Sequence, residues 1–383
     1  MSDAPPAFSP FDCQPRTRIV FGIGTVERAG GLAREAGIKR ALLVTDKGVV
    51  AAVHAERARA SLEAAGVKTS LFDGVRENPT TRDVALCVEA ARQAGVGGIV
   101  GLGGGSSMDT AKGCNFLLTN GGQMQDYWGV AKAARPMLPL IAIPTTAGTG
   151  SECQSFALIA DERTHQKMAC GDPKAAARAA ILDPALTLSQ PRHVAACTGV
   201  DALSHALETA VTRRRNAISL AYSREAFRLC AASLPRVLTA GDDLDARGGM
   251  LAGAALAGLA IENSMLGAAH AAANPLTAHF GVVHGRAVGL MLGPVIQFNA
   301  EDPVAAGLYT ELHPGGADYL TERLGEWLSL AGVPRSLSDY GVKEADIPML
   351  AAEAAKQWTA AFNPRPVAEA DFARLYQGAM ACR

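Results

Sequence analysis

Short apolar runs alternate with helical patterns along the first half of the chain. Continuous apolar runs of this kind are typical of strands that are buried on both faces of a parallel sheet. The predicted strands are Arg18–Phe21, Ala41–Thr45, Thr69–Phe72, Gly98–Leu102, Leu140–Pro144, Phe156–Ala160, Gln166–Ala169 and Ala179–Asp183. Helical patterns follow the first four of them, at Val26–Ala36, then up to about Ala65, up to Ala94 and at Met108–Leu118. This alternation predicts an α/β domain with a Rossmann-like parallel sheet.

The pattern changes near Pro191, where β-branched runs give way to long segments rich in Ala, Leu, Gly, Glu and Arg. Such segments predict helices. They are Gly199–Val211, Asn216–Leu238, Ala246–Ala273, Gly285–Phe298, Tyr319–Leu330, Ile347–Thr359 and Glu369–Ala379. The sequence therefore predicts two domains, an α/β domain over residues 1–190 and an all-helical domain over residues 191–383.

The composition describes a compact folded protein. Of the 383 residues, 49% are hydrophobic and 19% are charged, which is unlike a disordered chain. The formal net charge of −1 gives no electrostatic reason to expect nucleic acid or an anionic membrane as a partner. The apolar run at residues 248–261 is too short to span a bilayer and predicts a buried helix.

The N-terminus lacks a basic segment followed by an apolar one, so the sequence predicts no signal peptide. The eight cysteines include no CxxC pair. Unclustered thiols in a chain of this length are typical of a reducing compartment. We therefore expect a cytoplasmic protein.

Two short segments contain side chains that bind transition metals. Asp201 and His205 stand four residues apart and project from one face of a predicted helix. His270 and His284 lie in a nearly uncharged stretch of small residues. One carboxylate and three imidazoles suit iron, zinc or a similar ion, and suit calcium or magnesium poorly. The alternative is a set of hydrogen-bonded core histidines with an aspartate at a helix start.

A glycine-rich turn follows the fourth predicted strand and precedes a helix. It consists of Gly103, Gly104 and Gly105, followed by Ser106. Strand, glycine turn and helix together direct backbone N–H groups and the positive helix end toward a phosphate. Consecutive glycines allow positive φ angles and a close approach by a ligand. The alternative is a tight βα turn that binds nothing.

Polar residues also follow two other predicted strands. The loop Thr145–Glu152 offers several hydroxyls that could hold ribose and phosphate oxygens. Asp46 ends the second strand, where an acidic residue hydrogen-bonds the adenosine ribose in dinucleotide folds and repels the extra phosphate of NADP. An N-cap role for Asp46 is the alternative.

Several of these segments resemble the iron-containing (group III) alcohol dehydrogenase family. They are GVDALSHALE at residues 199–208, HAAANPL from residue 270, GGGSSMDTAK from residue 103, IPTTAGT from residue 143 and TDK from residue 45. The resemblance covers nearly the whole chain. It implies a dehydroquinate-synthase-like fold, with a dinucleotide-binding domain followed by a helical domain for metal and substrate.

The resemblance also implies roles for individual residues. The metal ligands and catalytic residues are Asp201, His205, His270 and His284, with Fe2+ or Zn2+ as the ion. The contacts with NAD are Asp46, Asn78, Gly103, Gly104, Gly105, Ser106, Asp109, Thr145, Thr146, Thr149 and Lys167. The implied activity interconverts a small alcohol with an aldehyde or ketone by hydride transfer, with the metal as Lewis acid in the inter-domain cleft. A homodimer or larger assembly is expected.

One position departs from the family pattern. Asn274 stands where well-known members have a second histidine, in HAxAHPL, that is often assigned to proton relay. Asparagine cannot take up a proton at working pH. We expect the proton to leave through water and the cofactor ribose rather than through His279.

Three other functions remain as alternatives. A hydroxyacid–oxoacid transhydrogenase would turn over without added NAD. A dehydroquinate-synthase-like lyase would need basic residues for a phosphate and a carboxylate, and residues 267–285 contain neither lysine nor arginine. The third is a metal-binding protein without catalysis.

Overall fold

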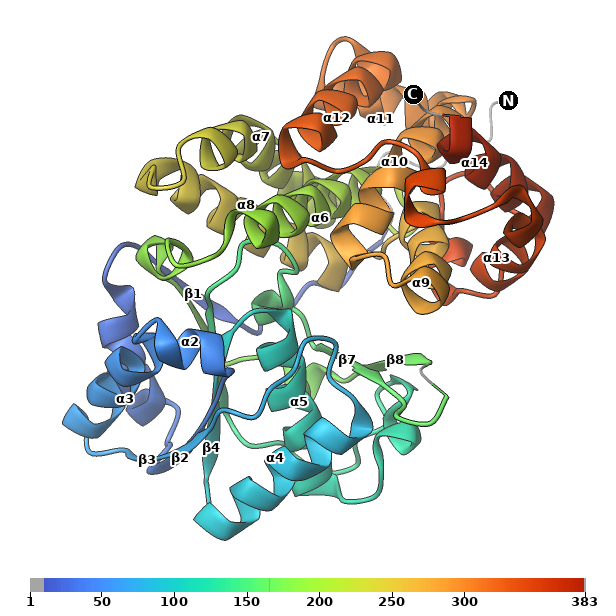
Figure 1. Cartoon of the computed structure of the whole chain (residues 1–383). Helices are drawn as coiled ribbons and strands as arrows, with labels where there is room; N and C mark the ends of the chain where they lie inside the picture. Colours follow the sequence, from blue (N-terminus) through green and yellow to red (C-terminus); the bar gives the residue numbers. More distant parts are fainter. Residues whose placement is uncertain (1–9, 165, 382–383) are drawn as a thin grey trace. The chain divides into compact units, whose positions relative to one another are not determined.

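The computed structural model describes residues 10–164 and 166–381, which form two compact units (Figure 1). The first unit spans Gln14–Gln190. The second begins at Pro191 and includes residues 10–13. The predicted fold class, an α/β region followed by a helical one, is confirmed.

The first unit is built on a six-stranded parallel sheet with strand order β1-β9-β6-β4-β2-β3. The strands are β1 (Arg18–Phe21), β2 (Arg40–Val44), β3 (Lys68–Phe72), β4 (Gly98–Gly103), β6 (Leu140–Pro144) and β9 (Ala179–Leu182). The central strands β2, β4 and β6 each have a neighbour on both sides, so their carboxyl ends lie together at one edge. Loops that follow these strands are thereby brought together.

Helices cover both faces of this sheet, which explains the continuous apolar runs in the strands. Leu42 and Ile99 belong to one core, and their neighbours Leu43 and Val100 belong to the other, as expected when successive side chains point to opposite faces. The helices are α1 (Ala29–Glu35), α2 (Lys47–Ala51), α3 (His54–Ala64), α4 (Thr81–Ala94) and α5 (Gly105–Asn120), with short 3-10 turns η1 (Thr25–Arg28), η2 (Met124–Tyr127), η3 (Ser151–Cys153), η4 (Pro173–Ala175) and η5 (Pro184–Thr187).

Two predicted elements of this unit differ in the structure. The helix expected to reach Ala65 is divided into α2 and α3, because Val53 takes a left-handed conformation with φ of 64°. The strands expected at Phe156–Ala160 and Gln166–Ala169 form an antiparallel hairpin, β7 (Phe156–Ala160) with β8 (Lys167–Gly171). With β5 (Gly129–Val130) they make a separate three-stranded sheet.

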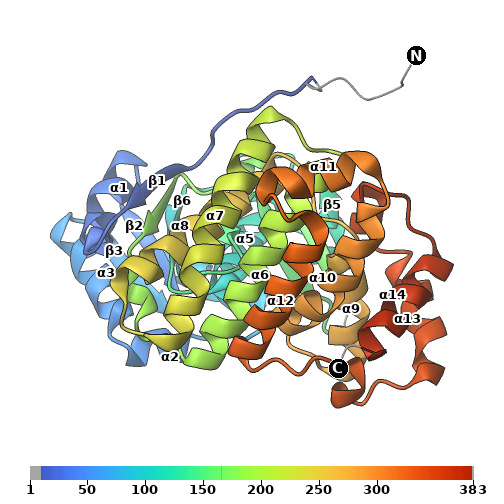
Figure 2. The ribbon, with the colours of Figure 1, turned by 90° about the horizontal axis from the view of Figure 1, so that it is seen from above.

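The second unit consists of helices, and its described residues contain no strand. The helices are α6 (Arg192–Val211), α7 (Ala217–Thr239), α8 (Leu244–Glu262), α9 (Ala268–Phe280), α10 (His284–Ala300), α11 (Pro303–Leu312), α12 (Gly316–Ala331), α13 (Ile347–Ala354) and α14 (Glu369–Ala381), with 3-10 turns η6 (Leu337–Tyr340), η7 (Glu344–Asp346) and η8 (Trp358–Phe362). Figure 2 shows α6, α7 and α8 side by side, and α6 also packs against α10 and α12. Nearly every residue of α6 after Val194 is buried, as expected for a helix at the centre of a bundle.

The helix predicted over Ala246–Ala273 is two helices, and this prediction was wrong. At the end of α8 the Asn263 side chain donates to Leu259 O at 2.9 Å and Ser264 Oγ donates to Ala260 O at 2.6 Å. These bonds satisfy carbonyls that end the helix. Gly267 then starts α9, where a Cβ would lie only 3.1 Å from Glu208 Oε1. The chain thus turns at residues 263–267 and presents His270 in the first turn of a new helix.

Among the described helices, only α8 is long and apolar enough to cross a membrane by length and composition. Of its most apolar stretch, 67% is buried inside the protein. It packs against α6 and α7. It is therefore the buried helix that the sequence predicted at residues 248–261.

Gly285 allows α10 and α6 to approach backbone to backbone. A Cβ at Gly285 would lie 2.1 Å from the carbonyl oxygen of Cys197. We expect Gly285→Ala to force the two helices apart and to lower the free energy of unfolding by about 1–3 kcal/mol. Urea unfolding followed by circular dichroism would measure it.

Gly307→Ala is the matched control. Gly307 lies in α11, and nothing lies within 4 Å of the position of its Cβ. The added methyl group should raise the free energy of unfolding by about 0.5–1 kcal/mol, because alanine has a higher helix propensity than glycine. Similar effects of the two substitutions would show that the contact between α6 and α10 can relax.

Candidate metal centre

Three helices of the second unit supply the predicted metal ligands. Asp201 and His205 are one turn apart on α6. His270 is the third residue of α9 and His284 is the first residue of α10. Gly281, with φ of 64°, and the two valines after it connect these two helices. This connection leads into α10, which packs against α6 at His284, while the start of α9 is held to α6 by a hydrogen bond from Ala269 N to Glu208.

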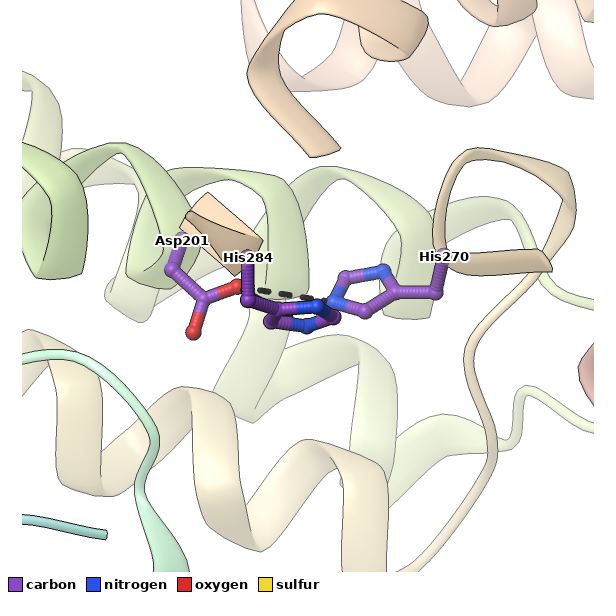
Figure 3. A group of neighbouring side chains, drawn as sticks. All are labelled: Asp201, His270 and His284. Atoms are coloured by element: carbon purple, nitrogen blue, oxygen red, sulfur yellow. Dashed lines mark ion pairs between the residues drawn. The ribbon is translucent and has the colours of Figure 1, made fainter. Parts of the chain in front are cut away.

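The histidines converge on one oxygen of the carboxylate. The distances from Asp201 Oδ1 to Nε2 are 3.5 Å for His205, 3.6 Å for His270 and 3.9 Å for His284. The rings of His205 and His270 are stacked, with centroids 4.8 Å apart. Figure 3 shows Asp201, His270 and His284 pointing toward one another from three segments. Their potential ligand atoms all lie within 4.8 Å of one another.

This cluster is largely removed from solvent. Asp201, His205 and His270 are buried, while 27% of the His284 side chain is exposed. Burial alone would raise the pKa of Asp201, but the three histidines hold it well below its usual range. Burial alone would lower the pKa of His270, but the carboxylates of Glu208 and Asp201 raise it to about 9. Without a metal, the protonated ring of His270 helps to balance the buried carboxylate.

The donor atoms fit a transition-metal ion. Asp201 Oδ1 and His270 Nε2 are buried and have no hydrogen-bond partner among the described residues, and their separation of 3.6 Å exceeds hydrogen-bonding distance. Buried polar atoms without partners are costly. One divalent cation between them would satisfy both atoms, and a mixed nitrogen and oxygen set suits iron or zinc.

In the first unit, the predicted glycine turn lies at the carboxyl end of β4. Gly103 has φ of 143°, and a Cβ there would lie 2.3 Å from Ser107 Oγ. Gly104 is the N-cap of α5, and no described side chain caps this helix start. The positive end of a 16-residue helix is thus presented at a turn without side chains, which is an arrangement suited to a phosphate.

The loop after β6 packs on this turn, as parallel neighbouring strands require. Thr145 N donates to Gly103 O at 2.9 Å. A Cβ on Gly104 would lie 3.3 Å from Thr146 Cγ2, and one on Gly105 would lie 2.7 Å from Thr149 Cγ2. The hydroxyl-bearing residues predicted to bind the cofactor therefore lie directly against the glycines.

The loops after β2 and β3 reach the same place. Asp46 Oδ2 would be 3.4 Å from a Cβ on Gly103, and Asp46 Oδ1 accepts from Val49 N at 3.0 Å as the N-cap of α2. Asn78 has a positive φ of 52°, and its N–H donates to Ser106 Oγ at 3.3 Å. Asp46 is thus a helix cap that also borders the glycine turn.

Two predicted cofactor residues have other surroundings. Asp109 is buried in α5 and accepts from Ser151 Oγ at 3.0 Å. The buried Lys112 ammonium donates to Ser151 O at 2.6 Å and to Ser151 Oγ at 2.9 Å. Asp109 therefore helps to hold the end of the loop to α5. Lys167 is exposed at the start of β8, in the smaller sheet.

Two family models match the chain. They are iron-containing alcohol dehydrogenase, over residues 15–184, and Fe-containing alcohol dehydrogenase family, C-terminal, over residues 195–380. Alcohol dehydrogenase 4 of Schizosaccharomyces pombe is 35% identical over 367 residues, which are 94% of this chain and 87% of that protein.

Solved structures of related enzymes have the same fold over nearly the whole chain. A 1,3-propanediol oxidoreductase superposes with a TM-score of 0.92 at 31% identity, over 97% of this chain and 100% of that one. Sulfoacetaldehyde reductase from Bifidobacterium kashiwanohense, in complex with NAD+, gives a TM-score of 0.90 at 26% identity, over 97% and 99%.

The chain belongs to the iron-containing alcohol dehydrogenase family. The resemblance drawn from the sequence is thereby confirmed. The protein is an oxidoreductase that acts on alcohols and aldehydes.

In this iron-containing alcohol dehydrogenase, an amide pair occupies the position of the family's second histidine. Asn274 Nδ2 donates to Gln357 Oε1 at 3.0 Å. Neither side chain can exchange a proton at working pH. His279 contacts Glu353 Oε2 at 2.9 Å, and both side chains are exposed on the surface, by 40% and 41%.

Sequence reasoning missed one residue that contacts the cluster. Glu208 Oε2 lies 2.5 Å from His270 Nδ1. A signal was present, because Glu208 follows Asp201 by seven residues and so lies on the same face of α6. An acidic residue beside a predicted metal-binding face could have been read as a partner of one of the histidines.

Glu152 gives a pH-dependent prediction. It lies in η3 and is 2% exposed, and burial raises its pKa from 4.5 to about 7. The folded protein thus holds this proton more tightly than the unfolded chain does, so stability is lost as the pH rises from 4.5 through 7. Glu152→Gln has the shape of the protonated glutamate and carries no charge. It should raise the free energy of unfolding by up to about 3 kcal/mol at about pH 8, and by little at about pH 5.

The difference in stability would be measured as the urea unfolding midpoints of wild type and Glu152→Gln, without added cofactor, at about pH 5 and about pH 8. Glu162→Gln is the control, because the Glu162 side chain is 49% exposed. An effect of Glu152→Gln that does not vary with pH would contradict the prediction.

Proposed function

We propose that this chain is a metal-dependent NAD(H) alcohol dehydrogenase that interconverts a small alcohol with an aldehyde or ketone. This proposal rests mainly on the convergence of three imidazole Nε2 atoms on the buried Asp201 Oδ1. Asp201, His205, His270 and His284 hold Fe2+, with Zn2+ as the other ion that suits these donors. Residues 1–190, except residues 10–13, which belong to the second unit, then form the dinucleotide-binding domain, and residues 191–383 form the metal-binding and substrate domain.

A divalent ion in this cluster supplies Lewis-acid polarisation of an alcohol or carbonyl oxygen. The protein's own residues fix where this happens. Asp201, His205 and His270 come from buried helix positions, so they are rigid ligands. His284 is the partly exposed one, with 27% of its side chain in contact with solvent. Substrate and water therefore approach from the His284 side.

NAD is the cofactor that the first unit best accommodates. The start of α5 and the glycine turn hold the pyrophosphate, and Thr145, Thr146 and Thr149 lie beside them. The related sulfoacetaldehyde reductase was solved with NAD+. Asp46 borders the turn with a carboxylate, which repels a 2′-phosphate and so favours NAD over NADP.

Proton transfer follows from the surroundings of Asn274. Its amide donates to Gln357, so this position cannot act as a relay. His279 is held on the surface by Glu353. Neither Asn274 nor His279 would therefore carry the proton, which leaves water and the ribose of a bound NAD as the groups that would do so. We also propose a cytoplasmic location, since none of the seven described cysteines forms a disulfide.

His270→Ala tests the proposed function. Gently purified wild type should contain nearly one iron or zinc per chain. It should oxidise NADH, in preference to NADPH, when aldehydes or ketones from a panel are added. His270→Ala should lose the metal and lower carbonyl-dependent NADH oxidation by more than about 100-fold, because it removes a ligand.

His193→Ala is the control, since His193 is exposed near the start of α6 and should leave the metal content unchanged. Metal-free wild type with full activity would refute the proposal. Turnover between two acids without added NAD would favour the transhydrogenase instead.

We further propose that the protein forms a homodimer or larger homo-oligomer through β1. This strand is at the edge of the sheet, and the described chain places no strand on its outer side. Phe21 and the nearby Ile23 are 52% and 64% exposed. An apolar edge strand with free backbone groups is a template for pairing with another copy.

Phe21→Lys should shift the mass measured by light scattering from a multiple of the chain mass to that of one chain. Leu71→Lys is the matched control, because Leu71 is 47% exposed on β3, at the opposite edge. If only Leu71→Lys dissociated the assembly, the interface would lie at the β3 edge and the proposal for β1 would be wrong. A monomeric wild type would exclude the assembly.

A further inference from the structure

We propose that Glu208 is a positioning residue that sets the tautomer and the orientation of His270 for metal binding. This inference rests on the proposed metal site. Glu208 is 4% exposed on α6, on the face that carries Asp201. Its two oxygens have separate partners. Oε2 lies 2.5 Å from His270 Nδ1, and Oε1 accepts from Ala269 N at 2.7 Å.

The contact with Nδ1 determines which ring nitrogen is available. A carboxylate only accepts hydrogen bonds, so Nδ1 of His270 must carry the proton that it donates to Glu208. The other nitrogen, Nε2, is then free to bind a cation. It is the nitrogen that faces Asp201 Oδ1, at 3.6 Å. The hydrogen bond also raises the basicity of the ring, which strengthens a metal–imidazole bond.

The second contact fixes the backbone that carries this ring. Ala269 N is in the first turn of α9, where N–H groups lack partners within the helix. A carboxylate at this helix end is favoured by the helix dipole. Gly267 has no Cβ, and one there would lie 3.1 Å from Glu208 Oε1. Glu208 therefore holds the ring and the adjoining backbone together.

A buried amide pair supports the same turn from another direction. Asn363 Oδ1 accepts from Ala268 N at 3.2 Å, and Asn363 Nδ2 donates to Asn299 Oδ1 at 2.7 Å. Both asparagines are 1% exposed. The first turn of α9 is thus held at two successive N–H groups. Of these supporting residues, only Glu208 contacts the imidazole.

Glu208→Gln tests the inference with little change in shape. A glutamine amide has one oxygen and one NH2 group, so it cannot accept from both His270 Nδ1 and Ala269 N. The dissociation constant for Zn2+, measured by competition with a chelating dye, should rise by about 10- to 100-fold. Thermal unfolding of the metal-free proteins would show how much of the change is structural.

Glu353→Gln is the matched control. Glu353 also pairs with a histidine of α9, His279, but that pair is exposed and outside the cluster. Its substitution should leave the Zn2+ affinity unchanged. A double-mutant cycle gives the sharper test. His270→Ala should lose the metal on purification, but its three remaining ligands should still allow weak binding of added Zn2+. In this background Glu208→Gln should have almost no further effect on Zn2+ affinity, because Glu208 acts through His270.

The outcomes separate this inference from the proposed function. Wild type that binds no Zn2+ through His270 would refute the metal site itself. Wild type that binds Zn2+, with an unchanged affinity in Glu208→Gln, would overturn the role of Glu208 alone. An equal loss of affinity in both backgrounds would show a merely structural role and would also overturn it.

A measurement on the wild-type protein tests the inferred tautomer of His270 even if Glu208→Gln does not fold. Nitrogen NMR of the Zn2+-loaded protein, labelled at histidine, distinguishes the two ring nitrogens. His270 should keep its proton at Nδ1 and show metal binding at Nε2. Metal binding at Nδ1 would contradict the inference.

Discussion

Burial of the Asp201 carboxylate is the constraint on which the helical unit depends. A carboxylate removed from water is strongly destabilising unless positive charge or a cation faces it. Here three imidazoles face it, from α6, α9 and α10. The three helices must therefore meet at this point. Gly267 and Gly285 allow this, because each lies where a Cβ would press on the neighbouring helix α6.

The central position of α6 links this chemistry to the fold. Its burial on nearly all sides holds the helix rigidly, and side chains on rigid elements can be placed accurately. One face of it carries two of the proposed ligands and the carboxylate that contacts a third. In the first unit the parallel sheet has the corresponding role. The strands β2, β4 and β6 are neighbours, so loops distant in sequence meet at the glycine turn.

Features of short range could be predicted from the sequence. The four-residue spacing of Asp201 and His205 determined their common face, and the order of strand, glycines and helix determined the turn at Gly103. Each of these inferences needs only local geometry. The meeting of this turn with the loop at Thr145 depends also on β4 and β6 being neighbours in the sheet, which the structure shows.

Features fixed by distant contacts could not be predicted. The segment at Ala246–Ala273 is rich in alanine, and the start of α9 within it is held by hydrogen bonds from Ala269 N to Glu208 and from Ala268 N to Asn363. The partner of His270 is 62 residues away along the chain. The helical pattern of this segment contains no information about either contact. The one signal lies in α6, where Glu208 shares a face with Asp201. The division into α8 and α9 is therefore visible only in three dimensions, although it is what places His270 in a first helical turn.

Asn274 shows how the same packing accommodates a departure from the family pattern. Replacing a histidine by asparagine at a half-buried position leaves an amide that needs partners, and Gln357 supplies one at 3.0 Å. The pair is neutral at every working pH, so it adds no charge on α9 one turn after His270. The cost is the loss of a titratable group. In the proposed route the proton leaves through water, and the partly exposed His284 is where the cluster meets solvent.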